Sequence, residues 1–248
     1  MRNFALTLLI ILAAGTVTGQ TWLQMTELKT LPPLPEPVTN NAVASVKVQD
    51  REFIISFAGL ALGKSHNDTH ARTFVLDDMD REWLETAAIP GDVGRLAATA
   101  IGVGERAYVF GGYTVAEDGS EVSTPWVHAF DPLSGEFEER QSMPVPVDDA
   151  IAVSYENRFI YLISSWHDFG NDNPHNFDGI GYAGKASSPS ADALFFSLES
   201  YSWQQIAVDG PATMDHRGLV PFDGDWLTIG GMLEGQQVSD NVASYEFD

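Results

Sequence analysis

The feature that most constrains this chain is a repeat in which a short apolar run ends in two small residues. Four copies occur, separated by 53, 53 and 66 residues: Phe57-Ala58-Gly59, Phe110-Gly111-Gly112, Ile163-Ser164-Ser165 and Ile229-Gly230-Gly231. A fixed period of this length indicates one supersecondary unit used several times, and it decides the architecture before any single element does. The longer last interval contains an insertion.

Each small pair marks the end of the second of four predicted strands. The first strands are the Ala/Val-rich runs Ala42 to Val48, Leu96 to Val103, Ala150 to Tyr155 and Leu219 to Phe222. After a loop come a third strand (residues 74–77, 128–131 and 194–198) and a fourth strand with an aromatic at Trp83, Phe137 or Trp203. Period-two alternation, closely spaced turns and the lack of a helical stripe predict an all-β fold with four antiparallel strands per repeat, which is a propeller blade.

A glycine pair after an apolar strand, followed by an Asp and then an aromatic six residues on, resembles the Kelch repeat. Asp77 to Trp83 and Asp131 to Phe137 show this spacing. The resemblance implies a Kelch-type β-propeller with four blades, an unusual count because members of the family usually have six or seven. The predicted blades are about residues 41–90, 94–144, 147–211 and 215–248, the last together with 21–33.

The fourth repeat stops at Asp248, the position of Asp77 and Asp131, before its fourth strand. Residues 21–32 read like residues 82–90, which contain a fourth strand. We therefore expect the N-terminal strand from Trp22 to Leu31 to complete the last blade and close the four-bladed propeller without a covalent bond.

The N-terminus has the pattern of a secretory signal. Arg2 is followed by an apolar run and then by small residues, so residues 1–19 are predicted to be a signal peptide and residues 20–248 a single propeller domain. A retained anchor is the competing interpretation. Because no later segment has the roughly 20 apolar residues of a membrane helix, we expect no membrane span and a periplasmic or secreted location.

The composition excludes several classes of function. Thirteen Lys and Arg against 35 Asp and Glu give a net charge of −22, which disfavours nucleic acid as a partner. This acidic surface suits cations or a salty habitat equally well. The absence of cysteine excludes disulfides and thiolate chemistry. It also excludes the copper-radical cofactor of galactose oxidase, a Kelch relative that requires a Cys crosslinked to Tyr.

One rim of the predicted propeller carries most of the chemistry-bearing residues. If strands run outward in sequence order, the loops after second strands and the turns before first strands lie at the same end. At the channel mouth the turns supply polar residues, namely Asn40, Asn41, Arg95, Asp148, Asp149, His216 and Arg217. Such residues suit proton transfer on a sugar or binding of its carboxylate. Hydrogen-bonded turn residues, with Arg–Asp pairs between blades, are the structural alternative.

The longest of these loops, residues 166–191, interrupts the third repeat where the small pair has become Ser164-Ser165. Loops of this length are usually functional or disordered. Its mixture of aromatic, amide and carboxylate side chains suits a sugar, which stacks on aromatic rings and bonds through its hydroxyls. The predicted ligand-binding residues are Asn40, Arg95, Arg217, Trp166, His167, Asp168 and Tyr182.

Histidines on the same rim suggest a second possibility. His66 and His70 lie four residues apart, and His167 and His175 are in the long loop. These four are suitable ligands for zinc or another transition metal, although their spacing matches no specific site. No cofactor is expected, and a divalent metal stays an open alternative.

These observations together predict an exported Kelch-type propeller that binds a small polar ligand, a carbohydrate, on this rim. Two alternatives remain open. The resemblance to sialic acid epimerases implies a sugar epimerase or mutarotase, with Asp148, Asp149 and His216 as catalytic acid or base and Arg95 and Arg217 holding an anionic group. The other is a scaffold that binds a protein partner.

Overall fold

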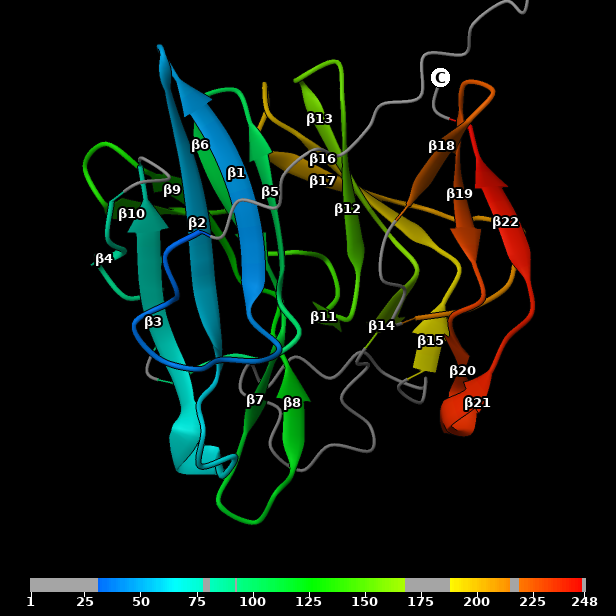
Figure 1. Ribbon diagram of the computed structural model, residues 1–248. Helices are drawn as coiled ribbons and strands as arrows, with labels where there is room; N and C mark the ends of the chain where they lie inside the picture. Colours follow the sequence, from blue (N-terminus) through cyan, green and yellow to red (C-terminus); the bar gives the residue numbers. More distant parts are fainter. Residues whose placement is uncertain (1–30, 78–80, 92, 168–187, 215–218, 247–248) are drawn as a thin grey trace, which may run out of the picture. The chain divides into compact units, whose positions relative to one another are not determined.

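The protein is described by a computed structural model for residues 31–77, 81–91, 93–167, 188–214 and 219–246. These residues form antiparallel β-sheets with two short 3₁₀ turns, η1 (His66–Asp68) and η2 (Glu234–Gln236) (Figure 1). No helix among them is long and apolar enough to cross a membrane. The predicted all-β class is confirmed.

Three sheets have four strands each, and their strand order follows the sequence. The first contains β1 (Ala42–Val48), β2 (Arg51–Leu60), β3 (Thr69–Leu76) and β4 (Leu84–Glu85). The second contains β5 (Thr99–Val103), β6 (Arg106–Phe110), β9 (Val127–Asp131) and β10 (Glu136–Arg140). The third contains β12 (Ile151–Tyr155), β13 (Phe159–Ile163), β16 (Ala193–Ser197) and β17 (Ser202–Ile206). The predicted order of strands within a repeat is thus confirmed.

The fourth sheet has three strands among the described residues, β18 (Val220–Phe222), β19 (Asp225–Ile229) and β22 (Val242–Tyr245). Its predicted fourth strand, from Trp22, falls on residues 1–30, which lie outside the described part of the chain. Three predicted first strands begin too early: Leu96, Ala150 and Leu219 precede β5, β12 and β18. Leu96 instead makes an isolated bridge with Tyr113 at the end of the sheet.

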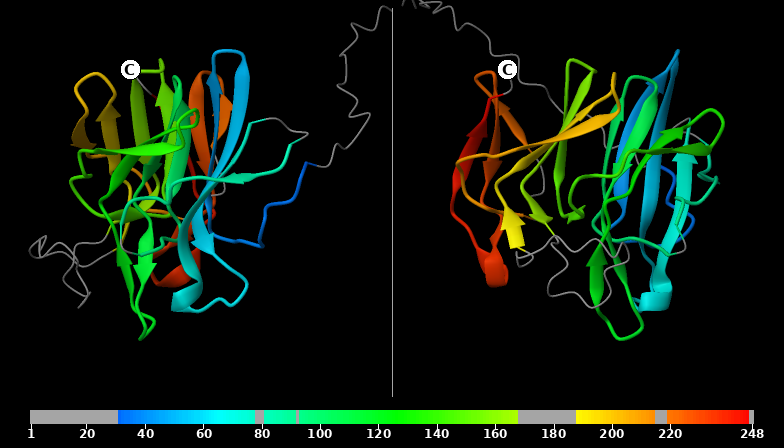
Figure 2. Two further views of the ribbon diagram at one scale, coloured as in Figure 1. Left: turned by 90° about the vertical axis from the view of Figure 1, so that its left-hand side faces the viewer. Right: turned by 180° about the vertical axis from the view of Figure 1, so that it is seen from behind.

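Each connection between a second and a third strand adds structure at the same end of its sheet. In the first sheet this is η1, and in the others it is a small hairpin, formed by β7 (Tyr113–Val115) with β8 (Glu121–Ser123), β14 (Ser165–His167) with β15 (Ser188–Ser190), and β20 (Met232–Leu233) with β21 (Gln237–Val238). These elements all lie toward the bottom of Figure 1 and of both views in Figure 2.

The sheets pack through their first strands and through apolar side chains between them. Strand β5 lies beside both β1 and β12. The approach is closest at Gly102, where an added Cβ would lie 1.8 Å from the Ser45 carbonyl oxygen, so only glycine fits there. Between the first two sheets, Phe57 meets Phe130 edge to face with ring centroids 5.5 Å apart.

The small pairs have a common backbone reason. The first residue of every pair has a positive φ: Ala58 at 53°, Gly111 at 54°, Ser164 at 52° and Gly230 at 74°. This left-handed conformation ends the second strand in three repeats, and in the first it causes a register shift, after which β2 continues to Leu60. Residues without a branched or bulky Cβ adopt it at the lowest cost. The repeated small pair in the sequence therefore reflects a backbone turn that recurs in each repeat.

Candidate functional site

The connections before first strands and after second strands lie together at one rim, as the sequence predicts. In every repeat a residue preceding the first strand pairs with a residue following the small pair. The pairs are Thr39 with Leu60, Leu96 with Tyr113, Val147 with His167, and Met214 with Met232. Four repeats thereby deliver loop side chains to the same end of the molecule.

A chain of backbone hydrogen bonds links neighbouring repeats along this rim. The Ala97 amide donates to the Asn40 carbonyl over 3.3 Å, and the Asp149 amide donates to the Ala97 carbonyl over 3.1 Å. All three residues have a positive φ, between 51° and 53°. Asn40 and Asp149 therefore occupy equivalent positions, as predicted, but the equivalent residue of the second repeat is Ala97 and not Arg95.

Arg95 is held inside the second repeat. Its side chain is 2% exposed. It donates to the Gly111 carbonyl over 3.0 Å and contacts His128 Nδ1 at 3.3 Å, with its guanidinium carbon 5.4 Å from the Trp126 ring centroid. Burial lowers the pKa of Arg95 to about 10. Because Arg95 remains a cation at neutral pH, it donates to His128 Nδ1, which acts as the acceptor.

His128, the hydrogen-bond partner of Arg95, is buried as well. Its side chain is 4% exposed at the start of β9. Burial, and secondarily the positive charge of Arg95, lower the pKa of His128 to about 3. The imidazole is therefore neutral at ordinary pH values, and its Nδ1 accepts the hydrogen bond from Arg95.

The turn before the third sheet brings acidic and aromatic residues together. Asp148 in β11 (Val147–Asp148) is 6% exposed, accepts a hydrogen bond from the Ser123 hydroxyl and stands opposite Trp166 in the β11–β14 pair. His167 is fully buried, whereas Asp149 and Trp166 are half-buried. Of the predicted residues of this region that the structure describes, Asp149 and Trp166 are partly exposed.

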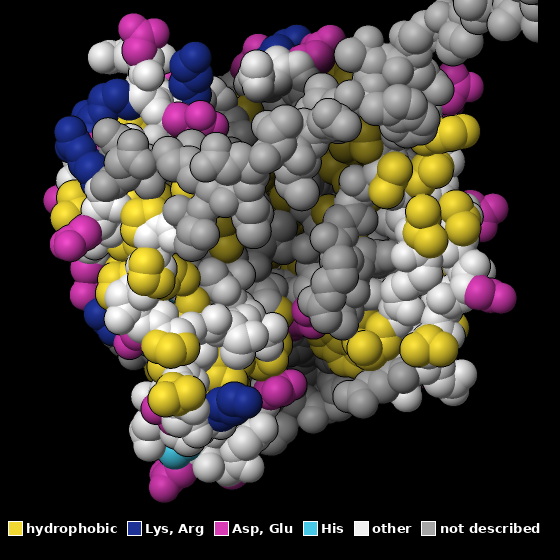
Figure 3. Space-filling model, in the orientation of Figure 1, with side chains coloured by type: hydrophobic (Ala, Val, Ile, Leu, Met, Phe, Trp, Pro, Cys, Tyr) yellow, Lys and Arg dark blue, Asp and Glu magenta, His cyan; other side chains and the backbone are white. Residues whose placement is uncertain are grey.

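The surface is hollowed beside the first strands, and acidic side chains lie at the lower edge of the hollow (Figure 3). This edge is the end at which β11 is labelled in Figure 1. Other predicted site residues fall outside the described part of the chain: the catalytic candidate His216, the ligand-binding candidates Arg217, Asp168 and Tyr182, and the metal candidate His175. Sequence position indicated neither Ser123 nor Trp126, although Trp126 directly precedes β9.

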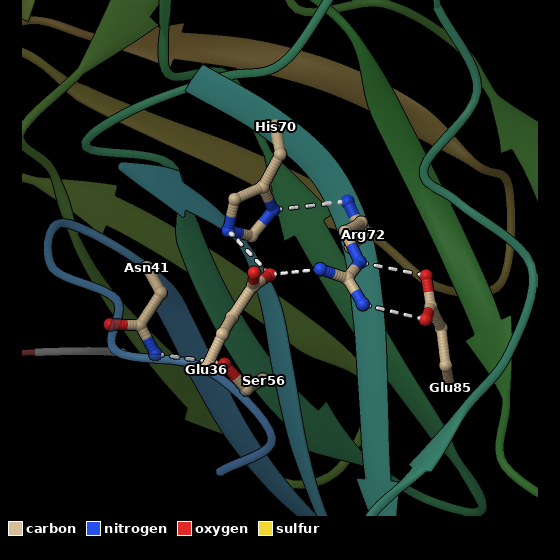
Figure 4. A network of polar contacts seen from close by, with 6 residues as sticks. All are labelled: Glu36, Asn41, Ser56, His70, Arg72 and Glu85. Carbon is tan, nitrogen blue, oxygen red and sulfur yellow. Dashed lines mark hydrogen bonds and ion pairs between the residues drawn. The ribbon is translucent and has the colours of Figure 1, made fainter. Parts of the chain in front are cut away.

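The first repeat holds a separate polar network around Arg72 (Figure 4). Arg72 makes two hydrogen bonds to the Glu85 carboxylate, of 2.8 and 2.7 Å, and a third to Glu36. These bonds raise the pKa of Arg72 and lower that of Glu85. Asn41, in the same view, donates to Ser56 over 2.9 Å.

His70 lies in this network, with Nδ1 accepting from the Arg72 amide at 3.2 Å and Nε2 3.8 Å from Glu36 Oε1. Burial lowers its pKa, and the nearby Glu36 opposes that shift. His66 is half-buried in η1. Among the described residues no three His, Asp or Glu side chains come together in a way that could hold a metal ion.

Comparison with known proteins bears on the second repeat. Residues 94–144, which contain β5 to β10, match the family model of the Kelch motif. This repeat is a Kelch motif. Both of its glycines are required by their surroundings: at Gly111 an added Cβ would lie 1.9 Å from the Val147 carbonyl oxygen, and at Gly112 it would lie 2.7 Å from that of Leu96.

The fold of most of the chain is also similar to that of a solved structure. The chain matches the structure of YjhT with a TM-score of 0.61 and 19% sequence identity, over 86% of this chain and 65% of the YjhT chain. A search of curated proteins gives no match. The Kelch motif and the shared fold confirm the predicted Kelch-type β-propeller. They do not define an activity, because one fold supports many functions.

Proposed function

We propose that this protein binds a carbohydrate at the rim formed by the turns before first strands and the loops after second strands. The observation that carries the proposal is the pairing of these two kinds of connection in all four repeats. It gathers unlike polar side chains at one end of the fold, which is where repeat architectures place their binding loops. Ligand specificity then comes from the loops and not from the repeats.

Asp149 and Trp166 are the residues we assign to the ligand. A half-buried indole offers a face on which a sugar ring stacks, and a carboxylate accepts hydrogen bonds from sugar hydroxyls. Asp148 is fixed by Ser123 and positions this turn. The Arg95 guanidinium bonds to the Gly111 carbonyl and to His128. We therefore assign Arg95 a structural role in holding the rim and not a contact with the ligand.

A thermal-shift screen tests the proposal. The purified protein is heated with neutral, amino and acidic sugars and, separately, with zinc, nickel, copper or calcium salts. We expect at least one sugar to raise the melting temperature, since a ligand that binds only the folded state stabilises it. Stabilisation by a metal alone would replace the carbohydrate with a metal site that includes His66 or His70. No response to any sugar would refute the proposal.

Asp149→Asn and Asp223→Asn form a matched pair for this screen. Asp149 has a φ of 51° and Asp223 a φ of 53°, a conformation that Asn tolerates, and Asp223 lies in the β18–β19 turn away from the rim. Asp149→Asn should abolish the sugar-induced shift, whereas Asp223→Asn should leave it intact. Equal loss in both variants would show that the effect is not local.

We propose the epimerase or mutarotase as the second candidate. Its support is the resemblance to sialic acid epimerases together with two carboxylates, Asp148 and Asp149, on one turn. Any sugar that raises the melting temperature is followed by NMR. A faster exchange of its anomers in wild type than in Asp149→Asn would favour the enzyme.

We further propose that the protein is exported and that the segment from Trp22 to Leu31 forms the fourth strand beside β22, giving four blades per chain. Sequencing the exported protein should show a start near Gln20. The support for the strand is a repeated contact: the Trp83 indole donates to the Pro32 carbonyl over 3.0 Å, as the Trp203 indole donates to the Gln141 carbonyl over 2.8 Å. Gln141 follows a fourth strand, so Pro32 should as well. Removing residues 21–31 should lower the melting temperature, and an unchanged value would refute the strand.

A further inference from the structure

The last sheet presents an apolar face to solvent. Val220, Phe222, Ile229 and Val242 are 48, 65, 59 and 62% exposed. Ile229 stands opposite Val242, and Val220 stands opposite Leu227, two residues from Ile229, so these side chains share one face. Figure 3 shows hydrophobic side chains gathered over β18, β19 and β22. A patch of this kind marks an interaction site.

The same position is buried in every earlier repeat. The counterparts of Ile229 are Phe57, Phe110 and Ile163, which are 0, 2 and 0% exposed. The sheet that follows covers each of them, as where Phe110 meets Phe196 of the third sheet with ring centroids 6.2 Å apart. The exposed face is therefore a surface for sheet packing that no sheet among the described residues covers.

Hydrogen bonds that cross each covered junction have no counterpart at this face among the described residues. The Gly59 amide donates to the Arg95 carbonyl over 3.1 Å, and the Gly112 amide donates to the Val147 carbonyl over 2.9 Å, in each case across to the next repeat. The equivalent amide of Gly231 donates to no backbone carbonyl in the described ranges. At the junction of the third and fourth repeats the Ser164 hydroxyl donates to the Thr213 carbonyl instead, over 2.9 Å. In every covered junction, therefore, a carbonyl of the next repeat accepts a hydrogen bond from the small pair.

The connection that leads into the first sheet has the sequence of a connection that is covered in a junction between sheets. Residues 34–40 repeat the pattern of residues 143–149, with matching prolines and a valine before the left-handed residue. Met143 and Val147 are 3 and 2% exposed in their junction, whereas their counterparts Leu34 and Val38 are only half-buried. This connection therefore has the sequence of a covered junction, but no sheet in the described part of the chain covers it to the same degree.

We propose that the exposed face of the last sheet receives the first sheet of a second copy of this chain. Within one chain, the exposed face of the last sheet and the connection before the first sheet do not cover each other. The chain also covers only 65% of the YjhT chain, so the similar structure continues beyond the part that this chain matches. Two copies joined head to tail would close a ring of eight blades, which lies within the size range of propellers. This inference is separate from the strand completion proposed above, because the exposed face and the first sheet both consist of described residues.

Cysteine pairing identifies the occupant, because the natural chain has no cysteine. At the first junction Gly102 lies against Ser45. By strand register, Ser45 occupies the place of Gly102 in the first sheet and Pro221 the place of Ser45 in the last. The double variant Ser45→Cys, Pro221→Cys should therefore form a disulfide-linked dimer on mild oxidation, and each single variant should not. A disulfide within one chain, or free thiols, would overturn the proposal.

Light scattering after size-exclusion chromatography provides the second measurement. The wild-type protein should have the mass of two chains. Val242→Asp, on the face, should halve the mass, whereas Val238→Asp should not, since Val238 is 90% exposed in β21. A monomeric wild type would overturn the proposal. If the cysteines link the copies but removal of residues 21–31 changes neither mass nor melting temperature, only the strand completion fails.

Discussion

Acidification should destabilise this protein through His128, and the size of the effect follows from its burial. In the folded protein the pKa of His128 is lowered to about 3 from its usual value of 6.5. Between these values the unfolded chain binds a proton that the folded protein does not, so stability present above pH 6.5 is lost as the pH falls. For this pair of pKa values the linkage relation gives a loss of about 2 kcal/mol between pH 7.5 and 5.

The assay compares urea unfolding of wild type and His128→Gln at pH 7.5 and pH 5. Glutamine keeps an acceptor for Arg95 but does not titrate, so the loss of stability on acidification should shrink by about 2 kcal/mol. His66→Gln, in η1, serves as the control for replacing a histidine outside the second repeat. An identical pH dependence in wild type and His128→Gln would refute the reasoning.

Three further outcomes are expected. Gly102→Ala places a Cβ against the Ser45 carbonyl oxygen and should cost about 3 kcal/mol or more of unfolding free energy. Gly104→Ala, in open space at a φ of 61°, should cost about 1 kcal/mol. Equal losses in urea unfolding would contradict the close approach at Gly102. Arg95→Met leaves the Gly111 carbonyl without its side-chain donor and should cost about 1 to 3 kcal/mol, while raising the pKa of His128, measurable by NMR titration. Trp83→Phe and Trp203→Phe each remove one indole hydrogen bond and should each lower stability by about 1 kcal/mol; a loss in Trp203→Phe alone would show that the Pro32 contact does not contribute.

The sequence predicted the elements of this fold well because the repeat has a local cause. A left-handed residue interrupts or ends each second strand, and the need for a small side chain there recurs four times. The turn is therefore visible in the sequence even where Ala58 or Ser164 replaces glycine. Alternation and turn residues then placed the neighbouring strands to within a few residues. The order of strands in a sheet follows because antiparallel neighbours joined by short turns pair with each other.

The candidate site was predicted less completely. Sequence position placed Asn40 and Asp149 at equivalent points of the rim, and the structure confirms this through the amide chain that passes by Ala97. It also grouped Arg95 with them as a ligand-binding residue, although Arg95 lies two residues before the equivalent position and turns inward. No periodic pattern distinguishes an arginine that faces a ligand from one that bonds to a carbonyl.

What the sequence determined by itself was therefore the repeated small pair and, through it, the strands, their order and the rim at which the loops meet. The tertiary structure alone decided which side chains of that rim are open and which surfaces are covered. Burial depends on the neighbouring sheet, and its residues are more than 50 positions away in the chain, as Phe57 is from Phe130. The same dependence makes the small pair of the last repeat different: Ile229 resembles Phe57 and Phe110 in sequence, but it stays exposed because no described sheet follows it.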